Sequence, residues 1–287
     1  MAEFLAELIR AATAADGQPP FSDQSLVELR NGTRKLISVG GDSGAALVAS
    51  TNGVRDAELV VHPDARHRGL GLRLLQDVIE AAPGEKLSEV LIWAHGDHPD
   101  ARALAAKHGF EPVRELLQLR MGLDTLAGAR YSTSTKAVDT NATSTKAVRA
   151  FCPGVDDAAW LELNALAFAD HPEQGKLTQP DLDARMAEAW FDPADFLLLQ
   201  RDNQLVGSCW LKVEGSLGEF YAVGVHPERR GEGLGRTLVT AGLQRLAGRG
   251  ILAASLYVEA DNEAAVRLYR SFGFADHTID IQYRLTR

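Results

Sequence analysis

Two glycine-rich segments have the composition of an anion-binding turn. Each follows a His-Pro pair and has the spacing Arg-x-x-Gly-x-Gly, with Arg66, Gly69 and Gly71 in the first and Arg230, Gly233 and Gly235 in the second. Glycines let the backbone turn tightly and come close to a ligand. Where such a turn opens a helix, backbone amides can bind a pyrophosphate without any charged side chain. The glycine spacing differs from that of a Rossmann dinucleotide site, and a Gly-Lys-Ser/Thr phosphate loop is absent.

These segments belong to a longer internal repeat. His62-Pro63 matches His226-Pro227, an offset of 226 − 62 = 164. At the same offset Asp97, Leu104, Gly109, Phe110 and Arg120 match Asp261, Leu268, Gly273, Phe274 and Arg284. An ungapped register over about sixty residues predicts the duplication of a whole domain.

A carboxylate and a phenol distinguish the second copy. Transfer of an acyl group to an amine requires an ammonium to lose a proton and the leaving group to gain one. Glu219 is a candidate base and Tyr269 a candidate acid, since their reference pKa values are about 4.3 and about 10. The offset of 164 pairs Glu219 with Arg55 and Tyr269 with Ala105, which cannot perform these roles. We therefore expect catalysis in the second copy, with rival bases and a rival acid in Glu214, Glu259, Glu263 and Tyr257.

The order of elements is the same in both copies. Strands are predicted over 57–61 and 220–225, each followed by the glycine-rich turn, a helix and a further strand at 90–94 or 254–258. Asp261 is expected to cap a helix that runs to about Ser271, Gly273 to end it, and 279–285 to form a last strand. Residues 196–215 are typical of a hairpin with an Asp-Asn turn. Each half is predicted to be α/β, with a mixed, mostly antiparallel sheet flanked by helices.

Length and composition predict two domains joined by a linker. The 287 residues, 45% of them hydrophobic, suffice for two packed domains, expected at 1–128 and 149–287. Between them, residues 129–148 are rich in Ser, Thr and Ala and contain STKAV twice, which is typical of a flexible linker, with a phosphorylated or bound tail as the alternative.

Charge and cysteine content exclude several classes of protein. A net charge of −9 without a basic run argues against nucleic-acid or anionic-membrane binding. Two distant cysteines, Cys152 and Cys209, form neither a disulfide scaffold nor a metal cluster, so we expect no metal and a reducing, cytoplasmic location. The N-terminal segment reads as an amphipathic helix, and no run approaches the roughly 18 apolar residues of a membrane span. We expect a monomer.

Beyond the turn itself, the His-Pro-x-x-Arg-x-x-Gly-x-Gly segment, the following helix and strand, the Asp261-Asn262-x-x-Ala-x-x-x-Tyr269 segment and Gly273-Phe274 resemble the GNAT acetyltransferase superfamily. The resemblance implies two tandem GNAT folds that use acetyl-CoA as co-substrate. In the second copy it implies acetyl-CoA contacts from Val223, Gly224, Val225, Arg230, Gly231, Glu232, Gly233, Leu234, Gly235, Arg236, Asn262, Glu263, Ala264, Ala265, Val266 and Arg267. The matching residues of the degenerate first copy are Leu59, Val60, Val61, His67, Arg68, Gly69, Leu70, Gly71 and Leu72.

Further segments, among them ELVVHP (58–63), WAHG (93–96), NALAFADHPEQG (164–175) and EAWFDP (188–193), resemble the mycothiol synthases, a family of tandem GNAT proteins. That resemblance implies transfer of acetyl to the cysteinyl amine of cysteinyl-glucosaminyl-inositol, which gives mycothiol and CoA. It assigns the base to Glu219, the acid to Tyr269, and substrate contacts to Asp23, Glu173, Lys212, Glu219 and Tyr257. The alternatives are a GNAT enzyme for a peptide N-terminus or an amino sugar, and a non-catalytic acetyl-CoA-binding protein.

Overall fold

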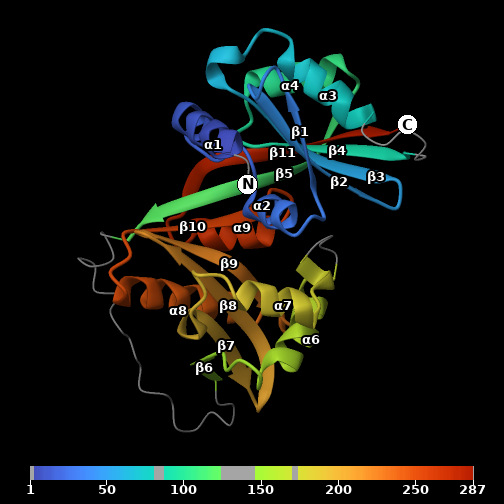
Figure 1. The fold of residues 1–287 in the computed structure, drawn as a ribbon. Helices are drawn as coiled ribbons and strands as arrows, with labels where there is room; N and C mark the ends of the chain where they lie inside the picture. The colour runs from blue at the N-terminus through green and yellow to red at the C-terminus, as the bar shows by residue number, and fades with distance from the viewer. Residues whose placement is uncertain (1–2, 81–86, 124–145, 170–173, 287) are drawn as a thin grey trace. The chain divides into compact units, whose positions relative to one another are not determined.

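The computed structural model describes residues 3–80, 87–123, 146–169 and 174–286, which fall into two compact units (Figure 1). Unit 1 comprises residues 1–118, 259–262 and 277–287, and unit 2 comprises residues 119–258 and 263–276. The expected domains 1–128 and 149–287 are each continuous in sequence, whereas each unit is built from segments that are not continuous in sequence. Most of the expected linker, residues 129–145, lies outside the described residues. Its expected end at 148 is wrong, because strand β6 begins at Lys146 and pairs with β7.

Unit 1 begins with two helices, and its sheet follows. Its elements are α1 (Glu3–Asp16), α2 (Asp23–Arg30), β1 (Lys35–Val39), β2 (Gly44–Thr51), β3 (Val54–Val61), the 3₁₀ turn Pro63–Ala65, α3 (Leu70–Glu80), β4 (Glu89–Ala94) and α4 (Pro99–Lys107). The strand order is β1-β2-β3-β4-β11, with the start of β5 (Glu111–Gly122) next. Apolar residues of α3 and α4 pack on one face of this sheet and those of α1 and α2 on the other.

Unit 2 repeats this plan. Its elements are β6 (Lys146–Ala150), α6 (Asp157–Ala167), α7 (Gln179–Met186), β7 (Phe196–Arg201), β8 (Gln204–Glu214), β9 (Leu217–Val225), α8 (Leu234–Gly248), β10 (Ala253–Glu259) and α9 (Glu263–Arg270), with 3₁₀ turns at Gln174–Lys176, Pro193–Asp195 and Pro227–Arg229. The strand order is β10-β9-β8-β7-β6, preceded by the end of β5. The predicted hairpin is confirmed, with Asp202 and Asn203 at φ of 53° and 62° in its two-residue turn.

The last strand of each sequence half contributes to the other unit. Strand β11 (Ala275–Thr286) pairs with β4 from Ile281↔Ala94 to Thr286↔Glu89, and Ile281 and Tyr283 lie in the core of unit 1. Conversely, the end of the first sequence half, from Leu119 to Leu123, belongs to unit 2, where the backbone amide of Leu123 donates to the carbonyl of Leu252. The two copies thus exchange their final strands. The alternating pattern of 279–285 predicts a strand but carries no information about which β-sheet it joins.

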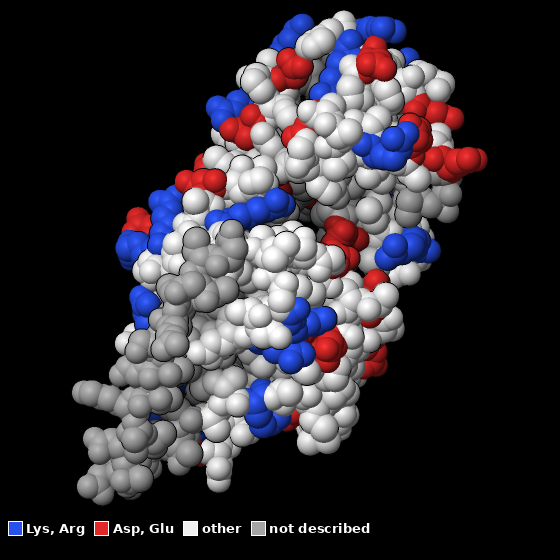
Figure 2. Space-filling model, turned by 90° about the vertical axis from the view of Figure 1, so that its left-hand side faces the viewer, with Lys and Arg blue, Asp and Glu red and all other residues white. Residues whose placement is uncertain are grey.

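Charged side chains are distributed over both units. On the face drawn in Figure 2, Lys and Arg side chains lie interspersed with Asp and Glu side chains, and the described residues form no broad basic area there. A search of the described residues finds no helix long and apolar enough to cross a membrane.

Candidate functional site

Strand β9 contains one residue more than its partner requires. The β8–β9 ladder runs from Gly207↔Val225 to Trp210↔Ala222 and resumes at Leu211↔Phe220, which leaves Tyr221 as the extra residue of a β-bulge. The phenol oxygen of Tyr221 accepts a hydrogen bond from Arg185 Nε at 3.1 Å. In unit 1 the β2–β3 ladder continues without a shift from Gly44↔Val61 to Thr51↔Val54. The bulge therefore distinguishes β9 from β3.

The bulge corrects the residue pairing derived from the sequence. Before the bulge, Leu256 pairs with Phe220 and the equivalent Ile92 (256 − 164) pairs with Ala57, so the offset in this part of the strand is 220 − 57 = 163. Glu219 therefore corresponds to Asp56, because 219 − 163 = 56. Its expected pairing with Arg55 is wrong, since an ungapped alignment cannot register a one-residue bulge. Unit 1 has a carboxylate at the position of Glu219 after all.

The bulge coincides with the end of a second ladder. Strands β9 and β10 pair in parallel from Ala253↔Leu217 to Leu256↔Phe220, and the ladder ends there. In unit 1 the equivalent β3–β4 ladder continues one pair further, to Glu58↔Trp93. Backbone groups of β9 beyond Phe220 are thus released from β10. Val223, Gly224 and Val225, predicted to contact acetyl-CoA, lie in this released part of the strand.

Glu219 lies half-buried between two polar neighbours on the sheet face that carries α6 and α7. Lys212 of β8 is directly opposite it, and Ser255 of β10 is its partner on the other side. Cross-strand partners point to the same face, so the three side chains are adjacent. Lys212 is buried, with Nζ 3.1 Å from Glu214 Oε2 and 5.7 Å from the centre of the Trp190 ring. The hydroxyl of Ser255, which the sequence reasoning missed, is buried without a hydrogen-bond partner among the described residues.

Tyr269 lies on the opposite, α8-bearing side of the sheet. Its ring packs edge-on against Phe274 with centroids 5.9 Å apart, and Phe274 packs in the same way against Phe220. Burial raises the pKa of the Tyr269 phenol, and the nearby Cys209 thiol adds to this rise. The phenol is consequently protonated at neutral pH. Glu219 and Tyr269 thus lie on opposite faces of the sheet, and Phe274 and Phe220 connect the Tyr269 ring to β9.

Backbone conformation explains the glycines of the two turns. Gly233 and the equivalent Gly69 have φ of 74° and 81°, and Gly231 has φ of 83°, in the left-handed region that glycine adopts without strain. The residue equivalent to Gly231 in unit 1 is His67, which adopts the same conformation at φ 59°. Both turns therefore share one geometry, and in unit 2 Gly233 caps the N-terminus of α8.

Close packing holds each turn in place. A Cβ on Gly235 would lie 3.1 Å from Leu268, and one on the equivalent Gly71 would lie 3.6 Å from the equivalent Leu104. The arginine of each motif connects the turn to the last residue of a helix, α1 in unit 1 and α6 in unit 2. Arg66 forms two hydrogen bonds with the Asp16 carboxylate at 2.6 and 2.8 Å, and Arg230 Nη2 donates to the carbonyl of Ala167 at 3.1 Å.

Charges around the second turn suit an anionic ligand. The carboxylate of Glu232 is paired with Arg201 and Arg229, which offsets its negative charge. Arg236, in the first turn of α8, donates to Ser271 Oγ at 2.8 Å and stacks on the Phe272 ring. The amides at the start of α8 provide further donors. These features fit a pyrophosphate at residues 230–236.

The structure places the other predicted residues as follows. Tyr257 is exposed on β10, on the same face as Ser255, and residues 263–267 form the start of α9, where Glu263 pairs with Arg267. Asn262 and the exposed Asp23, the first residue of α2, belong to unit 1. Ser22, not Asp23, caps α2. Glu173 lies outside the described residues.

In unit 1 the region equivalent to the Glu219 site is occupied by ion pairs. Asp56 Oδ1 lies 2.7 Å from Arg34 Nη2, and the buried Arg34 also binds Glu28. Tyr269 is replaced by Ala105 in α4. Arg55, on the other face, is fully buried and donates to the carbonyls of Val78 and Ile79 near the C-terminus of α3. Unit 1 thus pairs its carboxylate with Arg34 and has Ala105 in place of the Tyr269 phenol.

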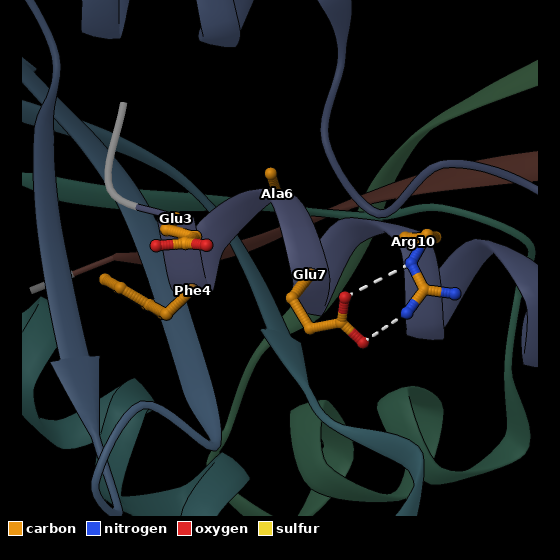
Figure 3. A pocket seen from close by; sticks show the side chains of 5 residues that line it. All are labelled: Glu3, Phe4, Ala6, Glu7 and Arg10. Atoms are coloured by element: carbon orange, nitrogen blue, oxygen red, sulfur yellow. Dashed lines mark hydrogen bonds and ion pairs between the residues drawn. The ribbon is translucent and has the colours of Figure 1, made fainter.

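A separate surface hollow contains none of these residues. It has a volume of about 380 Å³ and is lined by Glu3, Phe4, Ala6, Glu7 and Arg10 of α1, where Glu7 and Arg10 form an ion pair (Figure 3). Among the described residues no group of three or more His, Cys, Asp or Glu side chains is arranged to hold a metal ion.

Comparison with known proteins defines the class. The model of the acetyltransferase (GNAT) family matches residues 40–110 and 160–274. Two solved structures share the fold over 99% of this chain. They are a GCN5-related N-acetyltransferase from Sphaerobacter thermophilus (TM-score 0.68, 23% identity, 91% of that chain) and a tandem GNAT protein from the clavulanic acid biosynthesis pathway (TM-score 0.67, 18% identity, 94% of that chain). The chain therefore belongs to the acetyltransferase (GNAT) family.

Within that family the chain groups with the mycothiol acetyltransferases. The protein of that name from Streptomyces avermitilis is 46% identical over 99% of this chain and 91% of its own length. Those from Sanguibacter keddieii and Clavibacter michiganensis are 45% and 47% identical, over 98% and 97% of this chain and 92% and 89% of their own lengths. The resemblance noted from the sequence is thereby confirmed.

Proposed function

We propose that this protein transfers the acetyl group of acetyl-CoA to the cysteinyl amine of cysteinyl-glucosaminyl-inositol, giving mycothiol and CoA. The similarity to mycothiol acetyltransferases over nearly the whole chain carries this proposal. The presence of both Glu219 and a protonated Tyr269 in unit 2 supports unit 2 as the catalytic unit.

Each proton transfer has a candidate residue. The Glu219 carboxylate removes a proton from the substrate ammonium, and the neutral nitrogen attacks the acetyl carbonyl carbon. As the new C–N bond forms and the C–S bond breaks, the sulfur of CoA takes up a proton from the Tyr269 phenol, and the nitrogen loses its second proton, which returns the Tyr269 phenolate to the phenol. Lys212 and Tyr257, on the face of Glu219, are proposed to bind the substrate. A polyhydroxylated substrate requires several such polar contacts.

The first turn is proposed to bind a second acetyl-CoA without turnover. Its support is the shared geometry of Gly69 and Gly233. Lack of turnover follows from Ala105 in place of Tyr269 and from the pairing of Asp56 with Arg34.

Mass spectrometry of products tests the activity. The full chain with acetyl-CoA is offered cysteinyl-glucosaminyl-inositol, a cysteinyl peptide or glucosamine, each alone and in competition. We expect a gain of one acetyl group on the cysteinyl amine of the first and at least roughly tenfold slower turnover of the others. Equal or faster turnover of the peptide or the amino sugar would assign another amine to the enzyme.

A further inference from the structure

Ser255 is a buried polar residue that stability alone does not explain. It lies within β10 and is 1% exposed, and its hydroxyl has no hydrogen-bond partner among the described residues. A buried hydroxyl that stays unpaired destabilises the folded protein, whereas an apolar side chain of similar size does not. Its presence in the sheet of unit 2 therefore calls for another reason.

Ser255 stands in a row of three polar side chains that crosses three strands. It pairs with Glu219 in the parallel β9–β10 ladder, and Glu219 pairs with Lys212 in the antiparallel β8–β9 ladder. Partners in a ladder point to the same face of the sheet, and neighbouring strands lie roughly 4.8 Å apart. The Ser255 hydroxyl is therefore within reach of the Glu219 carboxyl group when this longer side chain turns towards β10.

Unit 1 shows that the fold does not require a hydroxyl at this position. Its equivalent row consists of Ala49, Asp56 and Leu91, because Asp56 pairs with Ala49 in the β2–β3 ladder and with Leu91 in the β3–β4 ladder. A leucine thus takes the place of the serine (255 − 164 = 91) beside the carboxylate that is ion-paired with Arg34. The serine accompanies the carboxylate of the proposed catalytic unit.

Proton transfer changes what Glu219 requires from its two neighbours. An ionised carboxylate only accepts hydrogen bonds, whereas a carboxylic acid also has an O–H group that donates one. Lys212 has donors but no acceptor, so it suits the ionised state alone. The Ser255 oxygen has lone pairs that can accept a hydrogen bond from the acid. The two neighbours of Glu219 thus suit its two protonation states.

We infer that Ser255 is a positioning residue that accepts a hydrogen bond from Glu219 after this carboxylate has taken a proton from the substrate ammonium. The inference rests on the proposed function, in which Glu219 is the base. In this step an N–H bond of the ammonium breaks and an O–H bond forms on Glu219, whose hydrogen points to Ser255 Oγ. The hydroxyl thereby stabilises a state that forms only as the reaction proceeds. The proton passes to water after product release.

Three substitutions at position 255 test this inference in the full chain, with whichever amine the chain acetylates fastest as the substrate. Ser255→Ala and Ser255→Val remove the hydroxyl, whereas Ser255→Thr keeps it on a side chain shaped like valine. We expect Ser255→Ala and Ser255→Val to lower kcat roughly tenfold or more, and Ser255→Thr to stay within about threefold of wild type.

Melting temperatures separate this role from a structural one. Because the hydroxyl has no partner among the described residues, its removal should not destabilise the protein. Ser255→Ala should melt no lower than wild type, and Ser255→Val no lower than Ser255→Thr. A loss of rate that is accompanied by an equal loss of stability in both comparisons would overturn the inference.

The pH profile of kcat reports which protonation state of Glu219 the hydroxyl serves. Without an acceptor for its O–H group, the protonated carboxyl gives up its proton more readily, so the acid limb should move to lower pH in Ser255→Val but not in Ser255→Thr. The limb is assigned to Glu219 by its loss in Glu219→Gln. All variants keep the other titratable and charged groups on this side of the sheet, among them Lys212 and Glu214 of β8, Tyr221 of β9, Tyr257 of β10 and Arg185 of α7.

Several outcomes would contradict this role of Ser255 while leaving Glu219 as the base. They are equal kcat values for Ser255→Val and Ser255→Thr, and an acid limb that moves to higher pH, since the hydroxyl would then serve the ionised carboxylate. In a Glu219→Gln background Ser255→Val should cause no further loss, because residues that act through one another are not additive. A further tenfold loss there would mean that Ser255 acts independently of Glu219. A wild-type rate for Glu219→Gln would instead remove the proposed base itself.

Discussion

Glu219 and Asp56 occupy equivalent strand positions in the two units, because Tyr221 adds one residue to β9 that β3 does not have. The two carboxylates differ in their neighbours. Asp56 is paired with Arg34 at 2.7 Å, whereas Glu219 lies in register with Lys212 and Ser255. What separates a proposed catalytic unit from a binding unit is therefore the setting of a carboxylate, together with the exchange of Tyr269 for Ala105.

Removal of either proton-transfer group should slow acetyl transfer. We expect Glu219→Gln and Tyr269→Phe each to lower kcat by roughly 10²–10⁴-fold, as for a general base or acid. Glu162→Gln, on the exposed surface of α6, and Tyr283→Phe, in the core of unit 1, are the matched controls and should stay near the wild-type rate. Steady-state kinetics with the cysteinyl amine provides the measurement, and wild-type rates for both site variants would remove the proposed mechanism.

Deletion of Tyr221 should convert β9 into a regular strand. The ladder pairs Trp210↔Ala222 and Leu211↔Phe220 then follow one another, as in unit 1, and β9 can pair with β10 beyond Phe220. We expect a folded protein whose kcat/KM for acetyl-CoA falls by roughly 10²-fold or more, because the released strand edge is lost. Tyr221→Phe keeps the extra residue and should lose much less. If the deletion variant folds and keeps the wild-type kcat/KM, the bulge is not needed for activity.

The two turns should bind acetyl-CoA independently. Gly69→Val and Gly233→Val each force a β-branched residue into the left-handed region, which costs about 1–3 kcal/mol and distorts one turn. By isothermal titration, wild type should bind two acetyl-CoA molecules per chain and each variant one. Only Gly233→Val should lose turnover. The turns would not be separate sites if Gly69→Val abolished turnover as well.

The charged groups Glu58, His95 and Asp280 of unit 1, which lie next to one another with both carboxylates buried, predict a free energy of unfolding that depends on pH. The folded pKa of His95, about 10, lies above its unfolded value, so its contribution is complete below about pH 6.5 and disappears as pH rises through 10. Glu58 has the opposite sign, since its folded pKa of about 2 lies below the unfolded value and its contribution disappears in acid. Urea denaturation should show His95→Gln destabilised strongly at pH 6. The difference from wild type should shrink by roughly 1 kcal/mol or more by pH 9.5. A difference independent of pH would show that His95 acts by packing alone.

Because the two sequence halves exchange their last strands, a core mutation in the last strand of one half should destabilise the unit that the other half mainly forms. Ile281 and Leu119 are both buried, Ile281 in unit 1 and Leu119 in unit 2. A buried unpaired carboxylate costs several kcal/mol, so Ile281→Asp should loosen unit 1 and Leu119→Asp should loosen unit 2. Hydrogen exchange should report loss of protection in β4 for the first variant and in β8 for the second. Loss of protection in β8 for Ile281→Asp would argue against the exchange.

Much of the site followed from the sequence because local chemistry dictates it. The turn glycines are required by backbone conformation, and Gly69 and Gly233 do have positive φ. The Asp202-Asn203 hairpin and the helices after both turns were predicted for equally local reasons. The offset of 164 also holds beyond the turns, where Gly71 meets Leu104 just as Gly235 meets Leu268.

Other features depended on the tertiary structure. The partner of a strand is chosen by the whole sheet, so no pattern in 279–285 could place β11 beside β4. A bulge is recognised only from the facing strand, so the sequence paired Glu219 with Arg55 instead of Asp56. The link from Glu58 through His95 to Asp280 joins residues up to 222 positions apart (280 − 58). The sequence by itself thus determined the two glycine-rich turns, the hairpin and the helices after the turns, because local conformation requires those residues, and the long-range pairing of strands decided which side chains of the two copies correspond.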